Sequence, residues 1–138
     1  MEKEDKKQSK CFVWFHNNYP ELRGLLCYNL NNTVAVIPNQ AKTILNKYKI
    51  LGTITNIFKK FAAISGGKNK LLGLQAGRSD MVFYYKSKAF MFEFKTETGR
   101  QSDKQKEWQK TIENAGFDYF IVRNENQFKS LILNILTN

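Results

Sequence analysis

Apolar residues in the second half of the chain form two short runs with the composition of β-strands. The runs at 81–85 and 89–94 are rich in aromatic residues and are separated by Lys86-Ser87-Lys88. This spacing predicts a β-hairpin. Successive positions in both runs are apolar, so both faces of each strand would be apolar. We therefore expect a sheet that is covered on each side.

A helix, a strand and another helix are predicted after the hairpin. The helical pattern over 102–115 ends at Gly116, a residue type that commonly closes helices. The run at 117–122 predicts a further strand, and 127–136 predicts the last helix. The order strand, helix, strand predicts a right-handed crossover between parallel strands. The expected fold class is therefore α/β, with a central mixed β-sheet flanked by helices.

The first part of the chain opens with a polar segment, residues 1–10, which we interpret as a flexible charged tail before a single domain over 11–138. A first clear helix is expected near Pro20, because proline suits the first helical position. The leucines that follow recur at helical spacing and would form one apolar face: Leu22, Leu25, Leu26 and Leu30. Glu21 would lie at the flank of that face, in the first turn, where the helix dipole favours an acid.

The residues between this helix and the hairpin carry both strand-like and helical patterns. The stretch 33–37 is rich in β-branched residues and predicts a short strand closed by Pro38. The pattern over 41–64 is mainly helical, with Gly52 interrupting it. The glycines and lysines of 65–70 predict a flexible basic loop.

Length and charge limit the classes to which the chain can belong. Its 138 residues suit one domain, and 42% hydrophobic residues are enough for a folded core. The 22 Lys and Arg exceed the 12 Asp and Glu, and the net charge of +10 favours a polyanionic partner such as nucleic acid. No apolar run approaches the roughly 18–20 residues that cross a bilayer, so we expect no membrane partner.

The cysteine count and the first residues predict a cytoplasmic location. Cys11 and Cys27 are the only cysteines, which argues against a disulfide framework and for a reducing setting. With His16 as the sole histidine, they also make a poor zinc site. The charged N-terminal sequence lacks the apolar core of a secretory signal peptide.

The strand over 90–95 carries charged residues at the end of an otherwise apolar run. Side chains alternate between the faces of a strand, so Glu93 and Lys95 share a face with Met91. Burying a carboxylate and an ammonium is costly unless they are paired or hold a metal. Taken alone, the two residues are explained by an ion pair at a strand end.

Asp80 extends this pair to a candidate catalytic centre. A hairpin centred near Ser87 returns Asp80 to the level of Glu93 and Phe94. A symmetric register would face Asp80 toward Phe94, so one bulge or one register step is needed to join it with Glu93. With that step, two carboxylates and Lys95 converge at one edge of the sheet.

Hydrolysis of a phosphodiester bond would use two acids and a lysine together. Asp80 and Glu93 would bind Mg²⁺ or Mn²⁺ through oxygen ligands, and the backbone carbonyl of Phe94 would complete the coordination. The metal would acidify a bound water and neutralise phosphate oxygens. Lys95 would position or activate that water and add positive charge close to the phosphate.

The spacing of these residues resembles a known signature. Asp80, followed after 12 residues by Glu93-Phe94-Lys95, is similar to the D-x(n)-E-x-K pattern of the PD-(D/E)xK nuclease superfamily. A longer series of motifs resembles, in content and order, the VRR-NUC (virus-type replication-repair nuclease) domain: Gly77-Arg78-Ser79-Asp80, Phe92-Glu93-Phe94-Lys95, Gly99-Arg100-Gln101-Ser102, Gln105 and Gly116-Phe117. Upstream segments are similar to the N-terminal helix and following loop of phage-type members: Asn18-Tyr19-Pro20-Glu21-Leu22-Arg23-Gly24-Leu25-Leu26 and Pro38-Asn39. The resemblance covers about residues 15–135.

This resemblance implies a restriction-endonuclease-like fold and roles for five residues. Asp80 and Glu93 would bind metal, and Lys95 would be catalytic. Glu21 would be a further acidic site residue, although a plain first-turn acid explains it nearly as well. Gln105 would complete the site from the helix after the catalytic strand, yet a capping box at the start of that helix explains it equally.

Two features depart from the family pattern. Ser79 stands where many relatives have proline, and the segment over about 40–74 is longer than the usual linker. We interpret this segment as a helical insertion with a role in substrate grip or dimer contact.

Basic residues surround the predicted centre. Arg78, Arg100 and Lys104 are expected to bind nucleic acid, and the last two flank a helix start that also favours phosphate. Such residues would grip phosphates without reading the base sequence.

The leading hypothesis is a nuclease that hydrolyses DNA phosphodiester bonds with Mg²⁺ or Mn²⁺. It would act as a homodimer on branched or junction DNA, as in DNA repair, in the cytoplasm of a bacterium or a phage-infected host cell. Two alternatives stay open: a non-cleaving nucleic-acid-binding module on the same fold, and a nuclease directed at RNA. Intact Asp80, Glu93 and Lys95 argue against the module, because a pure binder has no use for such costly charges.

Overall fold

The computed structural model describes most of the chain, namely residues 3–29, 37–73 and 75–138. The chain divides into two compact units. The first, formed by 1–31 and 76–138, contains the β-sheet and is called the sheet unit below. The second, formed by 32–75, contains only helices among its described residues and is called the helical unit.

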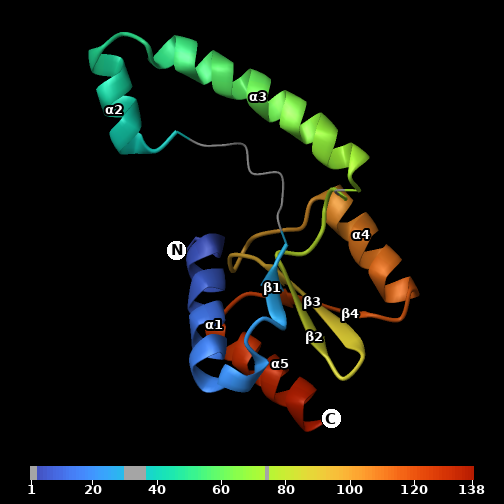
Figure 1. Ribbon diagram of the computed structural model, residues 1–138. Helices are drawn as coiled ribbons and strands as arrows, with labels where there is room; N and C mark the ends of the chain where they lie inside the picture. The colour runs from blue at the N-terminus through green and yellow to red at the C-terminus, as the bar shows by residue number, and fades with distance from the viewer. Residues whose placement is uncertain (1–2, 30–36, 74) are drawn as a thin grey trace. The chain divides into compact units, whose positions relative to one another are not determined.

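The sheet unit is built on a four-stranded sheet with helices on both faces (Figure 1). Its elements are α1 (Glu4–Asn18), a 3-10 turn (Pro20–Leu22), β1 (Leu26–Tyr28), β2 (Met81–Tyr85), β3 (Lys88–Phe94), α4 (Asp103–Asn114), β4 (Asp118–Val122) and α5 (Glu125–Thr137). The strand order is β1-β2-β3-β4. The pairs β1–β2 and β2–β3 are antiparallel, whereas β3 and β4 are parallel and are connected through α4. The predicted mixed sheet flanked by helices is therefore confirmed.

The β2–β3 hairpin turns through two residues. Lys86 and Ser87 both have positive φ, 45° and 62°, as tight hairpin turns that match the strand twist require. Lys88 already belongs to β3, where it pairs with Tyr85. The turn is therefore one residue shorter than the three-residue connection expected from the sequence.

This shorter turn changes the register at the other end of the hairpin. The ladder runs regularly from the turn to Met81, which pairs with Phe92. One further step along the same ladder sets Asp80 opposite Glu93. The sequence required one bulge or one register step, and the structure has the register step, which the shorter turn supplies.

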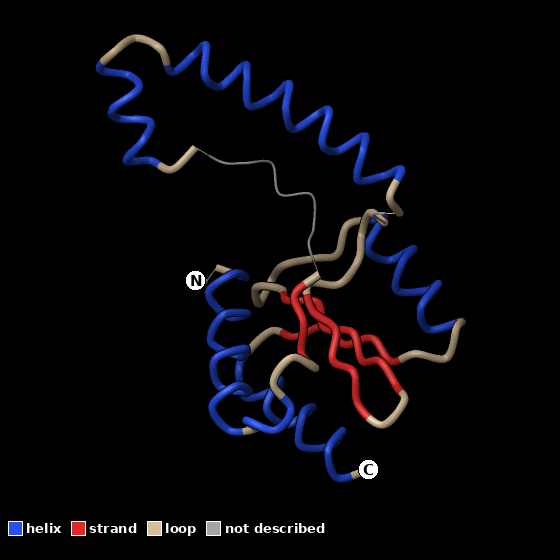
Figure 2. Tube along the Cα trace, in the orientation of Figure 1, coloured by secondary structure: helices blue, strands red, loops and turns tan. Residues whose placement is uncertain are grey.

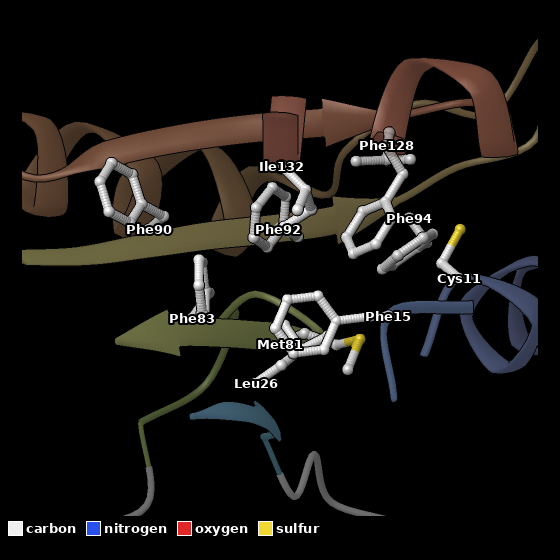
Figure 3. Close-up of a cluster of buried hydrophobic side chains, with 11 residues drawn as sticks. Cys11, Phe15, Leu26, Met81, Phe83, Phe90, Phe92, Phe94, Phe128 and Ile132 are labelled. Carbon is white, nitrogen blue, oxygen red and sulfur yellow. The ribbon is translucent and has the colours of Figure 1, made fainter. Parts of the chain in front are cut away.

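One face of the sheet carries the main hydrophobic core, which α1 and α5 cover (Figures 2 and 3). Its buried members are Cys11, Phe15, Leu26, Met81, Phe83, Phe90, Phe92, Phe94, Val122, Phe128 and Ile132. Several rings meet edge to face, such as Phe92 and Phe128 with centroids 5.2 Å apart. The alternating phenylalanines of β3 thus bind both terminal helices to the sheet.

The opposite face packs against α4. Its cluster consists of Val82, Met91 and Tyr119, with Cys27, Ala89, Trp108, Ile112 and Ile121 packed beside them. Both faces of the sheet are therefore apolar and covered, as predicted. A charged side chain on this second face of β3 is consequently buried unless it lies at the strand end.

The N-terminal segment is a helix rather than a tail. The buried residues of α1 are Lys7, Cys11 and Phe15, which recur every four positions and face the core as one stripe. The flexible tail predicted for residues 1–10 is wrong for the described part of that range. The polar composition of the first turns hides the helix, because only tertiary contacts show which side chains are covered.

The leucine-rich stretch after α1 does not form the expected helix. Pro20–Leu22 makes a single 3-10 turn, Gly24 adopts φ +87°, and the chain continues as β1. Leu26 is only 2% exposed and pairs with Phe83 of β2. Pairing with the sheet buries this leucine more completely than a surface helix would, so tertiary context overrides the local spacing.

The helical unit contains α2 (Asn39–Lys47) and α3 (Leu51–Leu71). None of the described residues of the two helices is buried. The chain breaks between them at 48–50, where Lys49 has φ 56°. Gly52, predicted to interrupt the helical pattern, lies inside α3.

Two further expectations concern this unit. The basic loop predicted for 65–70 is wrong, since these residues form the last turns of α3. Glycine lowers helix propensity and lysine leaves it nearly unchanged, but neither residue type prevents a helix. The strand predicted for 33–37 falls, apart from its last residue, outside the described residues.

Candidate active site

Asp80, Glu93 and Lys95 meet where β2 begins and β3 ends. Asp80 directly precedes β2, Glu93 lies on β3, and Lys95 directly follows it. The backbone N–H of Phe94 donates to Oδ2 of Asp80 at 2.7 Å. This bond holds the Asp80 carboxylate against the peptide group between Glu93 and Phe94. The structure therefore brings the three predicted residues together.

Glu93 is fully buried, and its two oxygens accept hydrogen bonds from three different elements. Oε1 lies 2.6 Å from the ammonium of Lys95 and also accepts from the side-chain amide of Gln105. Oε2 accepts from the hydroxyl of Tyr119 at 3.3 Å. Charged and neutral donors together compensate part of the loss of water around this carboxylate.

Gln105 fulfils both of the roles between which the sequence could not decide. Its side-chain oxygen accepts from the Ser102 backbone N–H at 2.9 Å, and its own backbone N–H donates to the Ser102 hydroxyl at 3.3 Å. These two bonds form a capping box at the start of α4. The remaining amide nitrogen donates to Glu93. The cap thus orients the amide that contacts the acid.

Gly77 allows the segment before Asp80 to pass directly against the start of α4. It has φ +80°, and a Cβ at this position would lie 2.9 Å from the backbone nitrogen of Gln105 and still closer to the carbonyl of Lys104. Any other residue type would force the two segments apart. The close approach therefore keeps Asp80 and Gln105 on the same side of the site.

Burial raises the pKa values of both acids, and Asp80 adds to the shift of Glu93. The pKa of Glu93 is raised to about 7, chiefly by burial and then by the nearby Asp80, against the opposing effects of Lys95 and Tyr119. Burial also raises the pKa of Asp80, although the Phe94 N–H and Lys95 oppose the shift. Two acids that repel each other in a buried position favour a cation between them.

The start of α1 also reaches the site, which the sequence reasoning missed. Glu4 accepts from the backbone N–H of Thr96 at 3.1 Å through Oε1, and its Oε2 lies 3.9 Å from the ammonium of Lys95. The buried ammonium of Lys7 donates to the backbone carbonyls of Lys95 at 3.3 Å and Arg123 at 2.6 Å. Lys7 thereby ties α1 to the ends of the parallel strands β3 and β4. The polar sequence of the first turn gives no local signal of these contacts.

Glu21 is not brought to this centre. It is exposed on the 3-10 turn that follows the far end of α1, whereas Glu4 begins the same helix at the site. A helix of 15 residues is about 22 Å long, so its two ends are well separated. Within the described ranges, no hydrogen bond or ion pair joins Glu21 to the other predicted residues. The acid contributed by the first helix is Glu4.

Tyr119 and Gln101 form a second group that the sequence did not indicate. Gln101 donates through its amide to Gln109 at 2.8 Å and to the hydroxyl of Tyr119 at 3.4 Å. Because Tyr119 accepts from Gln101, its own proton is directed to Glu93. A tyrosine in a strand is usually a packing residue, so no motif could have indicated this contact.

The loop after β3 is held by one arginine. The guanidinium of Arg123 donates to three backbone carbonyls along this loop, those of Thr96, Glu97 and Gly99, at 2.6, 3.1 and 3.0 Å. Arg123 directly follows β4, so this clamp fixes the loop to the neighbouring parallel strand. The path from Lys95 to the start of α4 is therefore well defined.

The predicted phosphate-binding residues lie on the segments that border the centre. Arg78 is half-buried, two residues before Asp80, and donates to the side chain of Asn29 at 3.2 Å. Arg100 is exposed on the loop after β3, and Lys104 is exposed in the first turn of α4. Their positions are compatible with phosphate contacts, and their role stays a prediction.

The donor set suits a divalent cation with oxygen ligands. Mg²⁺ is commonly held by one or two carboxylates together with water and substrate phosphates, and Asp80 and Glu93 form such a pair. No group of three His, Cys, Asp or Glu side chains within the described ranges could hold a metal ion by itself. Any ion would therefore complete its coordination with the Phe94 carbonyl, water or substrate.

Fold and site together define a class of protein. The mixed four-stranded sheet flanked by helices, with two acids and a lysine where β2 and β3 meet, is consistent with an α/β restriction-endonuclease-like fold. The model of the VRR-NUC domain matches residues 4–126, and the chain belongs to this family. The family is generally one of nucleases, and a nuclease domain implies a nucleic acid substrate.

A solved structure supports the fold. It is described as a VRR_NUC domain protein, is 14% identical, and superposes with a TM-score of 0.64 over 97% of this chain and 88% of its own. At this identity the likeness concerns the fold alone. No curated protein matches the chain. Among the described residues, no helix has the length and apolar character needed to cross a membrane.

Proposed function

We propose that the protein is a metal-dependent nuclease that hydrolyses phosphodiester bonds in DNA. The observation that carries the proposal is the convergence of Asp80, Glu93 and Lys95, with Glu93 also bound by Gln105. Two carboxylates raised in pKa by burial and repulsion favour a divalent cation, and the neighbouring ammonium favours an anionic substrate. This combination serves phosphoryl chemistry and has no purpose in a simple packing arrangement.

Each residue of the site would have a separate role that follows from its position. Asp80 and Glu93 would hold Mg²⁺ or Mn²⁺ together with the Phe94 carbonyl, and the bound ion supplies an acidified water and charge neutralisation. Lys95 places its positive charge at the edge where the phosphate would lie and stabilises charge that develops in the transition state. Gln105 orients the Glu93 carboxylate from α4. Arg100 and Lys104 would hold the flanking phosphates.

The test compares cleavage of labelled linear duplex DNA in Mg²⁺, in Mn²⁺ and in EDTA. We expect wild type to cut only with metal, and Lys95→Ala to cut at least about 100-fold more slowly, as for loss of a transition-state donor. Lys110→Ala, which removes an exposed lysine from α4, is the matched control and should cut normally. Binding without cutting in either metal would show a non-cleaving module, and cutting that survived Lys95→Ala would place the centre elsewhere.

The finer parts of the proposal need separate measurements. We propose selectivity for branched DNA, homodimer formation and membership of the PD-(D/E)xK superfamily as a phage-type enzyme. Four-way junctions should be cut faster than linear duplex of equal length, and light scattering should give twice the chain mass. Equal rates on both DNA substrates would remove the structure-selective part, and faster cleavage of RNA than of DNA would redirect the substrate class.

A further inference from the structure

The helical unit carries positive charge and no acid. Seven of the 22 Lys and Arg, and none of the 12 Asp and Glu, fall within 32–75. Fewer than a third of the residues thus supply seven of the ten net positive charges. The lysines are Lys42, Lys47, Lys49, Lys59, Lys60, Lys68 and Lys70. Charge of one sign destabilises a compact segment through self-repulsion, and an anionic partner relieves this repulsion.

Two lysines on helices of the sheet unit are paired with acids of the same helix. Lys106 pairs with Asp103 at 3.3 Å in α4, and Lys129 pairs with Glu125 at 2.8 Å in α5. Both are ion pairs between residues three or four positions apart on one helix, a common arrangement for solvated charges. The lysines of the helical unit cannot form such pairs, because the segment contains no acid. Negative charge for them must come from outside the unit.

Three lysines of α3 lie on one side of the helix. Ile54 and Phe58 mark its apolar side, and Lys59, Lys60 and Lys70 fall on the opposite side at 100° per residue. Lys59 and Lys70 are 11 residues apart, which is about three turns, so they lie on one line about 16 Å apart. All three are exposed. We call Lys59, Lys60 and Lys70 the α3 lysine stripe.

Double-stranded DNA offers a matching array of negative charge. It carries one phosphate charge per roughly 1.7 Å of axis with both strands counted, so about ten phosphates lie within this length of duplex. Lysine binds phosphates as a point charge and needs no defined groove. An exposed helix that carries lysines, in a unit without acids, therefore fits the DNA backbone without any base contact.

We propose that the α3 lysine stripe is a DNA-binding surface that supplies sequence-independent affinity in addition to the cleavage site. This inference rests on the proposed function, because a nuclease must hold a phosphate polymer. The helical unit then contributes binding, while the sheet unit performs the cleavage.

The test compares two triple variants of the full chain that change the net charge equally. The stripe variant replaces Lys59, Lys60 and Lys70 with glutamine, a residue of similar helix propensity. The control variant makes the same replacement at Lys86, Lys88 and Lys110, exposed lysines of the sheet unit. Binding to duplex DNA is measured in EDTA by fluorescence anisotropy over a series of salt concentrations. Cleavage at saturating DNA is measured in parallel with metal.

We expect the stripe variant to bind at least about tenfold more weakly at moderate salt. The slope of log affinity against log salt should fall by about 0.9 for each phosphate that the variant no longer neutralises, or nearly three in total. The control variant should show smaller changes in affinity and in salt slope. The cleavage rate of the stripe variant at saturating DNA should match that of wild type. Circular dichroism of both variants checks that helix content is unchanged.

Equal loss of affinity in both triple variants would show a general effect of net charge and overturn the proposal. Wild-type binding by the stripe variant would do the same. Sedimentation with phosphatidylserine vesicles tests an anionic membrane: loss of vesicle binding with intact DNA binding would assign the stripe to lipid instead. Metal-dependent cleavage without a stripe effect would refute only this inference, whereas a stripe effect without cleavage would refute only the proposed function.

Discussion

Replacement of Gly77 by alanine tests whether the close passage of its segment against α4 holds the site together. Gly77 has φ +80°, and an added Cβ would overlap the backbone of Lys104 and Gln105. Left-handed backbone costs a non-glycine residue about 1–2 kcal/mol, and overpacking against backbone that cannot yield adds about 1–3 kcal/mol. We expect Gly77→Ala to lower the free energy of unfolding by about 3 kcal/mol.

Gly116→Ala is the matched control for this variant. Gly116 has nearly the same φ, +85°, but nothing lies within 4 Å of an added Cβ. Gly116→Ala should therefore lower the free energy of unfolding only by the cost of the left-handed backbone, about 1 kcal/mol. The difference between the two variants isolates the overlap with the start of α4.

Urea unfolding followed by tryptophan fluorescence measures both variants. Trp14 and Trp108 are the two tryptophans of the chain and both lie in the sheet unit, so the signal reports on that unit. Cleavage by folded Gly77→Ala should also fall by tenfold or more, because α4 must shift and carry Gln105 away from Glu93. Destabilisation of Gly77→Ala no greater than that of Gly116→Ala, with normal cleavage, would refute this account of the site.

Three further outcomes follow from the contacts of the buried acid. Because the pKa of Glu93 rises from 4.5 to about 7 on folding, mainly through burial and then through Asp80, the folded state binds more protons between these values. The free energy of unfolding in EDTA should therefore decrease from pH 5 to pH 7.5 by up to about 3 kcal/mol. Glu93→Gln should remove most of this pH dependence. A flat profile for wild type would contradict the raised pKa of Glu93. Tyr119→Phe removes one donor to Glu93 and should weaken Mn²⁺ binding or cleavage by about 10–100-fold in a metal titration, whereas an unchanged half-saturation and rate would rule out a positioning role. Gln105→Ala loses the contact with Glu93 and the half of the capping box in which its side chain accepts from the Ser102 N–H. Ser102→Ala loses only the other half, in which its hydroxyl accepts from the Gln105 N–H. Both should lose about 1 kcal/mol in urea unfolding, but only Gln105→Ala should lose cleavage activity.

Local patterns were sufficient for the part of the fold that carries the chemistry. The hairpin, the helix capped by Ser102 and closed before Gly116, and the parallel strand after it all lie where the sequence predicts them. Each has a local cause: aromatic runs around a tight turn, a capping box, and a glycine with positive φ. The short spacing between Glu93 and Lys95 likewise needs no tertiary information, because side chains alternate along a strand.

Three features needed the folded structure. The first ten residues are polar, so nothing local distinguishes the start of α1 from a tail, and the position of Glu4 at the site depends on contacts with Thr96 and Lys95. The leucine spacing of 22–26 fits a helix, but pairing with β2 decides for a strand. The contact between Tyr119 and Glu93 joins β4 to β3, and only their parallel register brings the two side chains together.

The sequence by itself therefore determined the residue types of the chemistry, their order, and the strands and helix that present them. The tertiary structure decided which residues meet. Asp80 faces Glu93 because the hairpin turn has two residues rather than three, and Gln105 serves both the cap and the acid because Gly77 lets α4 approach so closely. Register and packing depend on contacts between distant segments, and hydrophobic periodicity does not specify which segments these are.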